Sequence, residues 1–330
     1  MESHQYLFTR SSLGEVLGIP LVGCIMLAIL VRTVALLPFA PSPRPTLDVD
    51  RTVIVNQVDS SFDSAAADIL LIGDSSCLMD VDAAYLSELS DTQVLNLGTL
   101  SFLSLESFSK LIANYLESHP TKPNKIVMLT HPDFVRKSST SAAHTAAFDH
   151  YIEKADHPYV SNAAWNPRAW LGIHIVEGRV LGRLPLPLTG PFRDYYGFNR
   201  ELIHHMDLHA GSAVDPRVLE MEDLKGSSDY RIAKTHFRNA EAFASVIPPE
   251  VPFYIGLTPL PQEFVKRDFR SEYQALLKEW AAVFPDSIPL LELPPTLDKQ
   301  QFATKTHLNE QAATEYTRRL HEHLTSLATQ

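Results

Sequence analysis

Cysteine is scarce in this 330-residue chain, occurring only as Cys24 and Cys77. Cys24 lies in an apolar N-terminal run and Cys77 lies far along the sequence, so we predict no disulfide between them. The low count does not locate the compartment, because many exported proteins lack disulfides. The sequence also lacks any Cys/His cluster with the spacing of zinc ligands, and we predict neither a metal nor a cofactor.

Basic residues are in the minority, with 28 Lys and Arg against 39 Asp and Glu, and the formal net charge is −11. No basic stripe is present, so a nucleic-acid partner is not expected. The apolar share of 45% is ordinary for a globular protein and allows a sizeable core. With no internal repeats, the length predicts one large domain plus an appendage.

One apolar run stands out at the N-terminus. It is unbroken over residues 16–31, is interrupted by Arg32 and Thr33, and continues over 34–40. Together these residues supply the ~20 that a bilayer core requires. We interpret 16–40 as a single-pass membrane anchor within an N-terminal region 1–45, which ends in a stiff Pro-rich spacer. A cleaved signal peptide and a buried soluble helix are the alternatives.

From residue 46 onward, short apolar runs alternate with helical patterns. Continuous apolar runs predict buried strands at 68–73, 94–98, 125–130, 251–257 and 288–293. Amphipathic spacing predicts helices from Asp82 through Leu89 and over 102–116, 230–245, 269–280 and 310–324. The alternation predicts an α/β domain over 46–330 with about five parallel strands and right-handed crossovers.

Residues 137–228 break this alternation and are rich in His, Pro, Tyr and Trp. We interpret them as an insertion or a lid-like subdomain. Its aromatic segments at 164–167 and 193–197 either line a sugar or acyl site or form a small core of the insertion itself.

Ser75 lies just beyond the strand predicted at 68–73, at the edge where an open parallel sheet places its site. Gly73 lets the chain turn, and the following helix start offers unpaired N–H groups to a developing oxyanion. A serine hydroxyl needs a base to act as a nucleophile, and His307 follows another strand and precedes the closing helix. We therefore predict Ser75 as nucleophile and His307 as base, with Asp74 stabilising the turn.

These two motifs carry a family resemblance. Gly73-Asp74-Ser75 after an apolar strand, together with Thr306-His307-Leu308-Asn309 near the C-terminus, resembles the SGNH (GDSL-type) hydrolase superfamily. The resemblance covers about residues 66–136 and 250–325. It implies a three-layer, flavodoxin-like fold, with the nucleophile in the first motif and the base in the last.

The middle motifs of the family are matched less fully. Asn96-Leu97-Gly98 looks like the second motif, which implies that the Gly98 N–H joins the Ser75 N–H in an oxyanion hole; a simple turn glycine is the alternative. The third motif usually supplies an Asn, whereas this chain has Thr130-His131-Pro132-Asp133. Losing that donor would cost roughly 3–4 kcal/mol unless it is replaced. His131 could donate instead, and Asp133 could bind substrate hydroxyls.

The last motif also departs from the family pattern. Thr304 stands three residues before His307, where the family usually has the Asp that orients the base. Asp298 could substitute as third member, or it could be a solvated surface acid. Losing the orienting acid lowers the rate without necessarily abolishing catalysis.

SGNH domains with a single N-terminal helix resemble accessory proteins of cell-envelope O-acylation systems. The resemblance implies an O-acyltransferase or acylesterase that acts on a polysaccharide through an acyl-serine, beside a multi-pass membrane acyltransferase, with the large domain extracytoplasmic. A lipid or small-ester hydrolase and a non-catalytic scaffold that binds the membrane acyltransferase are the alternatives. The acyl group, the acceptor and the direction of transfer stay open.

Overall fold

The computed structural model describes residues 10–35, 49–136, 140–153, 205–214, 232, 234–265 and 269–328. The chain divides into two compact units. The unit that holds the candidate site comprises Asp48–Asp156 and Arg193–Gln330, and the N-terminal helix belongs to the other unit.

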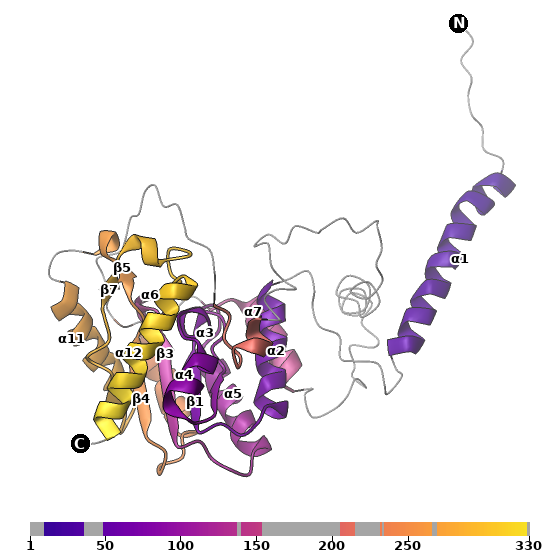
Figure 1. Ribbon diagram of the computed structural model, residues 1–330. Helices are drawn as coiled ribbons and strands as arrows, with labels where there is room; N and C mark the ends of the chain where they lie inside the picture. Colours follow the sequence, from indigo (N-terminus) through magenta and orange to yellow (C-terminus); the bar gives the residue numbers. More distant parts are fainter. Residues whose placement is uncertain are drawn as a thin grey trace, which may run out of the picture. The chain divides into compact units, whose positions relative to one another are not determined.

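A five-stranded parallel sheet forms the centre of the larger unit (Figure 1). Its strands run in the spatial order β2-β1-β3-β4-β6. They are β1 (Ile69–Gly73), β2 (Val94–Asn96), β3 (Lys125–Thr130), β4 (Phe253–Leu257) and β6 (Ile288–Pro289). The predicted class and the five parallel strands are confirmed. Strands β2 and β6 are shorter than the apolar runs that predicted them, because β2 pairs with β1 over three residues only and β6 pairs with β4 over two.

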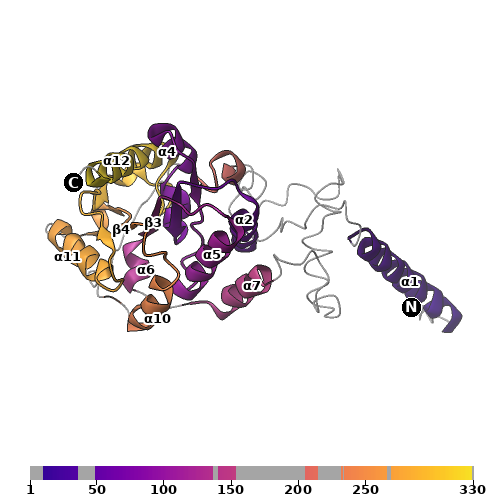
Figure 2. The ribbon, with the colours of Figure 1, turned by 90° about the horizontal axis from the view of Figure 1, so that it is seen from below.

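Both faces of the sheet are covered, so its strands are apolar at successive positions rather than at alternate ones. Leu70 and Ile72 of β1 join one hydrophobic cluster, whereas Ile69 and Leu71 join the other. Helices lie on the two sides of β3 and β4 in Figure 2, with α4 and α12 on one side and α5 and α10 on the other. The domain is therefore built in three layers.

The helices of the larger unit agree with their sequence signals. Asp82 caps α4 by accepting from Tyr85 N–H, and Ser104 caps α5 by accepting from Ser107 N–H. No residue range was predicted for the helices α2, α6 and α7; Lys110 of α5 forms an ion pair with Asp149 of α7. The helices are α2 (Val49–Asp63), α3 (Ser75–Asp80), α4 (Ala83–Ser90), α5 (Leu105–Ser118), α6 (Pro132–Arg136), α7 (Ala142–Ile152), α10 (Lys234–Ala244), α11 (Phe269–Ala281) and α12 (Glu310–Ala328).

Short elements complete the unit between β4 and α12. Two-residue strands β5 (Leu260–Pro261) and β7 (Thr296–Leu297) pair in parallel, and each is followed by a 3₁₀ turn, η3 (Gln262–Phe264) and η4 (Lys299–Gln301). An isolated bridge between Phe302 and Leu308 then closes the loop that carries His307.

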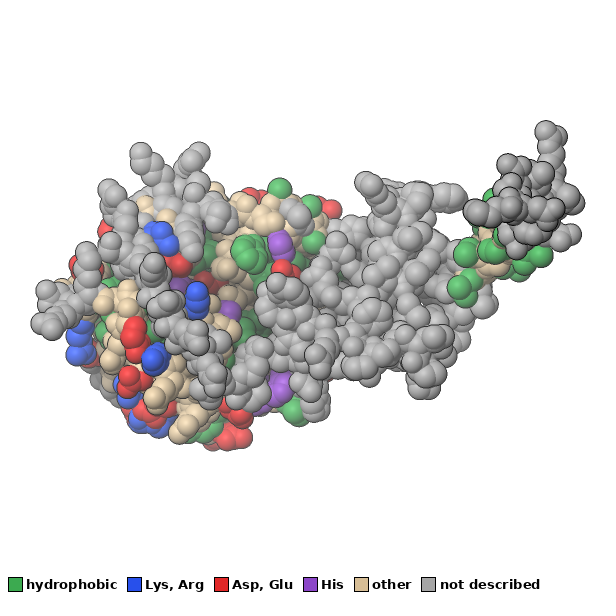
Figure 3. All heavy atoms as spheres, turned by 90° about the horizontal axis from the view of Figure 1, so that it is seen from above, with side chains coloured by type: hydrophobic (Ala, Val, Ile, Leu, Met, Phe, Trp, Pro, Cys, Tyr) green, Lys and Arg blue, Asp and Glu red, His purple; other side chains and the backbone are tan. Residues whose placement is uncertain are grey.

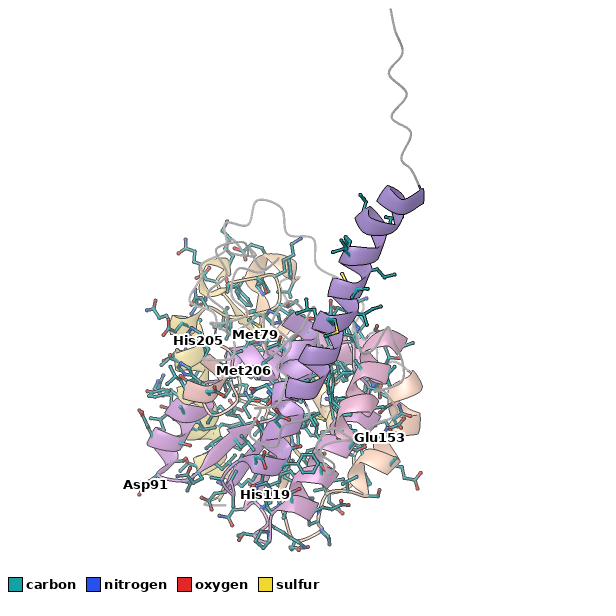
Figure 4. The ribbon with its side chains drawn as sticks, turned by 90° about the vertical axis from the view of Figure 1, so that its right-hand side faces the viewer. Met79, Asp91, His119, Glu153, His205 and Met206 are labelled. Atoms are coloured by element: carbon teal, nitrogen blue, oxygen red, sulfur yellow. The ribbon has the colours of Figure 1, made fainter. Side chains whose placement is uncertain are left out.

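Two described stretches of the predicted insertion are integral to the α/β unit. One is α7, and the other is 205–214, where Ala213 N–H donates to Leu78 O of α3 and Asn96 N–H donates to Ala210 O. In Figure 4, Met79 of α3 lies near His205 and Met206 of this segment. The aromatic segments 164–167 and 193–197 lie outside the described residues.

The N-terminal helix α1 (Arg10–Ala35) covers most of the apolar run and contains Pro20. Its described large side chains are exposed, from Val16 through Leu27. Among the residues that the structure describes, no helix is both long and apolar enough to traverse a bilayer.

The turn from β1 to α3 depends on Gly73. A Cβ built there would lie 1.8 Å from Leu129 O of β3. Since a backbone oxygen of a central strand cannot move away, we predict that Gly73→Ala lowers the free energy of unfolding by about 3 kcal/mol or more. Urea unfolding of purified protein measures this. Gly256→Ala is the matched control, because its nearest contact is the flexible tip of Leu129; equal losses in the two variants would contradict the prediction.

Candidate active site

The candidate site lies at the carboxyl end of the sheet, between β1 and β3. Chain connections leave this pair in opposite directions, to β2 on one side and toward β4 on the other, which is the topological switch point where α/β sheets bind ligands. Figure 1 shows α3 above β1 at this edge. Ser75 is the first residue of α3, so its N–H belongs to the helix end that lacks intrahelical partners.

The side chain of Asp74 joins α3 to the ends of β1 and β3 at this edge of the sheet. Its buried carboxylate caps α3 by accepting from Ser76 N–H at 3.0 Å and from Ser76 Oγ at 2.7 Å. It also accepts from His131 N–H at 3.1 Å, which joins the end of β1 to the end of β3. Burial raises the pKa of Asp74 from 3.8 to about 6, and these hydrogen bonds oppose the shift. The expectation that Asp74 stabilises the turn agrees with these contacts.

Ser75 and His307 meet across the site although they lie far apart in the sequence. The distance from His307 Nε2 to Ser75 Oγ is 3.0 Å, within hydrogen-bond reach. The Ser75 side chain is only partly buried, so an incoming group can reach it. The structure thus brings together the two residues that the sequence predicted as nucleophile and base, in the geometry that such a pair requires.

The other ring nitrogen of His307 faces Thr304, whose Oγ1 lies 3.1 Å from Nδ1. The same hydroxyl accepts from the N–H groups of Thr306 and His307 at 3.3 and 3.1 Å. A base needs its proton on Nδ1, which leaves Nε2 free to accept from Ser75. A carboxylate enforces this tautomer because it can only accept, whereas a hydroxyl can accept from or donate to Nδ1.

Asp298, the predicted third member, begins the 3₁₀ turn η4. Its own N–H donates to Gln301 Oε1 at 3.1 Å. The structure records Thr304 rather than Asp298 at His307 Nδ1.

Gly98, predicted as an oxyanion donor, packs directly against α3. A Cβ there would lie 2.5 Å from Leu78 N, so only glycine allows this approach. However, the Gly98 N–H donates to Asn96 Oδ1 at 2.7 Å. To stabilise an oxyanion, this N–H would first have to leave the Asn96 side chain.

Asn96 organises the region around Gly98. Its Nδ2 donates to Cys77 O at 2.8 Å and to Ser212 Oγ at 2.9 Å. Gln57 of α2 adds a second link, donating to Gly98 O and Gly211 O. These buried amides hold α3, the end of β2 and the segment 205–214 together. Sequence reasoning missed these links because they join groups that lie far apart in the chain, such as Gln57 with Gly211 O and Asn96 with Ser212 Oγ.

His131 and Asp133 lie at the end of β3. The His131 ring is nearly fully buried, and its Nδ1 accepts from Asp133 N–H at 3.1 Å, which leaves the ring proton on Nε2. One oxygen of the Asp133 carboxylate, Oδ1, accepts from both Nε and Nη2 of Arg136 of α6, at 3.1 and 2.9 Å. A substrate hydroxyl would therefore share Asp133 with Arg136.

A hollow of about 570 Å³ lies beside α4 and the start of α12. Several of its polar groups already bond one another, such as Asn309 with Gln300 O and Glu315 with Arg318. It is lined by Tyr85, Gln300, Gln301, Asn309, Gln311, Ala312, Thr314, Glu315 and Arg318. Seen from above in Figure 3, the described surface carries acidic and basic side chains interspersed, with histidines among them.

The described residues contain no group of three or more His, Cys, Asp or Glu side chains placed to hold a metal ion. In comparisons with known proteins, no family model and no curated protein matches this sequence. The candidate site therefore has to be judged from its own geometry.

The raised pKa of Asp74 predicts a pH-dependent stability. The folded state binds the proton of the Asp74 carboxyl more tightly than the unfolded chain does. Protonation of Asp74 therefore stabilises the fold fully below pH 3.8, and this stabilisation is lost as the pH rises toward 6. We expect the free energy of unfolding of the wild type to fall by about 3 kcal/mol over this range relative to Asp74→Asn. Denaturant unfolding at pH 4 and pH 7 measures the difference; parallel pH profiles would contradict it.

Because a hydroxyl rather than a carboxylate lies at His307 Nδ1, we predict that an acid at position 304 makes Ser75 more reactive. Thr304→Asp would place an acceptor-only group at Nδ1, hold the productive tautomer and stabilise the imidazolium. We expect Ser75 to react with a fluorophosphonate about tenfold faster or more in this variant at pH 7. Thr304→Val, which removes the hydroxyl, is the control and should react more slowly than the wild type. If Ser75 reacts more slowly in folded Thr304→Asp than in the wild type, the Thr304 hydroxyl already orients His307 fully and the prediction is wrong.

Proposed function

We propose that this protein is a serine O-acyltransferase or acylesterase with a three-layer, flavodoxin-like fold of SGNH type. The observation that carries the proposal is the 3.0 Å contact between His307 Nε2 and Ser75 Oγ at the switch point of the sheet. The resemblance of the two motifs to the SGNH superfamily supports the same role. The substrate would be an acylated glycan or polysaccharide of the cell envelope or a secreted one.

The mechanism follows from the dyad. Ser75 Oγ attacks the acyl carbonyl while His307 Nε2 takes the hydroxyl proton. The Ser75 N–H at the start of α3 stabilises the oxyanion. His307 then returns the proton to the leaving alcohol, and the acyl group stays on Ser75. In the second half, His307 takes a proton from a sugar hydroxyl or from water, and the oxygen of that group attacks the acyl carbon. The bond from the acyl carbon to Ser75 Oγ then breaks, and His307 returns the proton to Ser75 Oγ.

The proposal also includes the cellular location of the protein. Residues 16–40 would anchor the chain in the cell membrane, with the large domain extracytoplasmic and a multi-pass membrane acyltransferase as partner. The support is the length of the apolar run and the exposure of the described apolar side chains of α1.

A second function, a non-catalytic scaffold for such a membrane acyltransferase, is favoured by one contact. Asn96 Oδ1 occupies the Gly98 N–H, which removes a donor from the oxyanion hole. A Thr in place of the orienting acid points the same way. A lipid or small-ester hydrolase is the remaining alternative, and no contact among the described residues favours it.

Covalent labelling of the full chain in detergent with a fluorophosphonate tests the catalytic proposal. We expect the wild type to label, Ser75→Ala to lose labelling, and His307→Ala to label at least ~100-fold more slowly, because the base is gone. Ser76→Ala is the matched serine control and should still label, since its buried hydroxyl bonds Asp74. Absence of labelling in folded wild type would favour the scaffold.

Transfer can be told from hydrolysis with the same protein. An activated acetyl ester is supplied with and without an oligosaccharide acceptor, and the sugar is analysed by mass spectrometry. Acetylated sugar that depends on Ser75 indicates transfer, whereas free acetate alone indicates hydrolysis.

A further inference from the structure

Asp80 lies at the opposite end of α3 from Ser75, and its side chain is fully buried. Its Oδ1 accepts from Leu308 N–H at 2.7 Å. Leu308 directly follows His307. The short helix that carries the nucleophile therefore also holds the loop that carries the base.

Two hydrogen bonds close a ring between these segments. One joins Ser75 to His307 and the other joins Asp80 to Leu308. The first bond breaks and reforms during proton transfer, whereas the second involves no reacting atom. The second bond can therefore keep the loop in place through a catalytic cycle.

The other backbone hydrogen bonds of the loop are internal, while Leu308 also packs in the hydrophobic cluster that contains Cys77 of α3. His307 O accepts from the N–H groups of Ala303 and Thr304, and Asn309 N–H donates to Gln301 O. These bonds fix the shape of the loop, but they do not attach it to α3. The contact with Asp80 does so, and it crosses from one segment to the other through a side chain with no role in the chemistry.

The burial of Asp80 favours its neutral form, which suits a residue that holds the Leu308 N–H. Burial raises its pKa well above the ordinary value of 3.8, and nearby Asp74 adds to the shift, while the Leu308 N–H and the Thr258 hydroxyl oppose it. A neutral carboxyl still offers an acceptor oxygen to Leu308 N–H and avoids burying a charge beneath the nucleophile.

We propose that Asp80 is a positioning residue, whose buried carboxyl oxygen holds the Leu308 N–H and thereby fixes His307 against Ser75. The inference rests on the proposed roles of Ser75 and His307. Sequence reasoning gave no sign of it, because an acid at the end of a helix is ordinarily solvated.

The test compares three variants of the full chain. Asp80→Ala removes the acceptor, and Asp80→Asn keeps a carbonyl oxygen in the same place. Thr317→Val is the matched control, since buried Thr317 accepts from Asp82 N–H at 2.9 Å in a comparable contact that does not touch the loop. If Asp80→Ala does not fold, Asp80→Ser replaces it.

The first measurement is hydrogen exchange of the Leu308 amide. We expect exchange at least ~10-fold faster in Asp80→Ala than in the wild type, with protection kept in Asp80→Asn and Thr317→Val. Unchanged protection in Asp80→Ala overturns the proposal. This readout does not need a reactive serine, so it stands even if the wild type fails to label and the proposed function is wrong.

The second measurement is fluorophosphonate labelling as a function of probe concentration. Misplacing the base should slow the maximal labelling rate of Asp80→Ala by about tenfold or more without weakening probe binding, and Asp80→Asn should restore it. Thr317→Val should label like the wild type. Equal slowing in Asp80→Ala and Thr317→Val would assign Asp80 to general stability and overturn its positioning role.

Discussion

The buried carboxyl of Asp74 is the contact on which the site geometry depends. It binds the first turn of α3 through Ser76 and the end of β3 through His131. The ladder between β1 and β3 ends at the pair Gly73 and Leu129, and Asp74 joins the two chain segments just beyond it. With Asp74 between them, the orientation of α3 is set by the sheet, and Ser75 is presented at the switch point rather than on a mobile loop.

Much of this arrangement could be predicted because it depends on local signals. Buried parallel strands are continuously apolar, which identified the strands near Ile72 and Met128, and Asp82 and Ser104 are ordinary helix caps. Ser75 and His307 follow from strand ends and short motifs. Local signals did not predict the contacts of Asn96 with Cys77 O and Ser212 Oγ, or the contact of Asp80 with Leu308 N–H, because only the folded chain brings these groups together.

The occupied N–H of Gly98 and the hydroxyl at Thr304 act on different steps of the reaction. Asn96 Oδ1 competes with an oxyanion for the Gly98 N–H, so it affects the stabilisation of the tetrahedral intermediate. Thr304 affects which nitrogen of His307 carries the proton, and therefore the activation of Ser75. The pair can be weakened in both respects while its atoms remain within bonding distance, so proximity alone does not set the rate.

Asp74 and Asp80 are buried acids at the two ends of α3. Both Asp74 and Asp80 have pKa values raised by burial, and repulsion by the Asp74 carboxylate adds to the rise for Asp80. A proton on Asp80 removes that repulsion and still leaves an acceptor for Leu308 N–H, whereas an apolar residue would leave this N–H buried without a partner. Burial thus favours the neutral form of Asp80, in which the short helix is held at both ends without two buried charges.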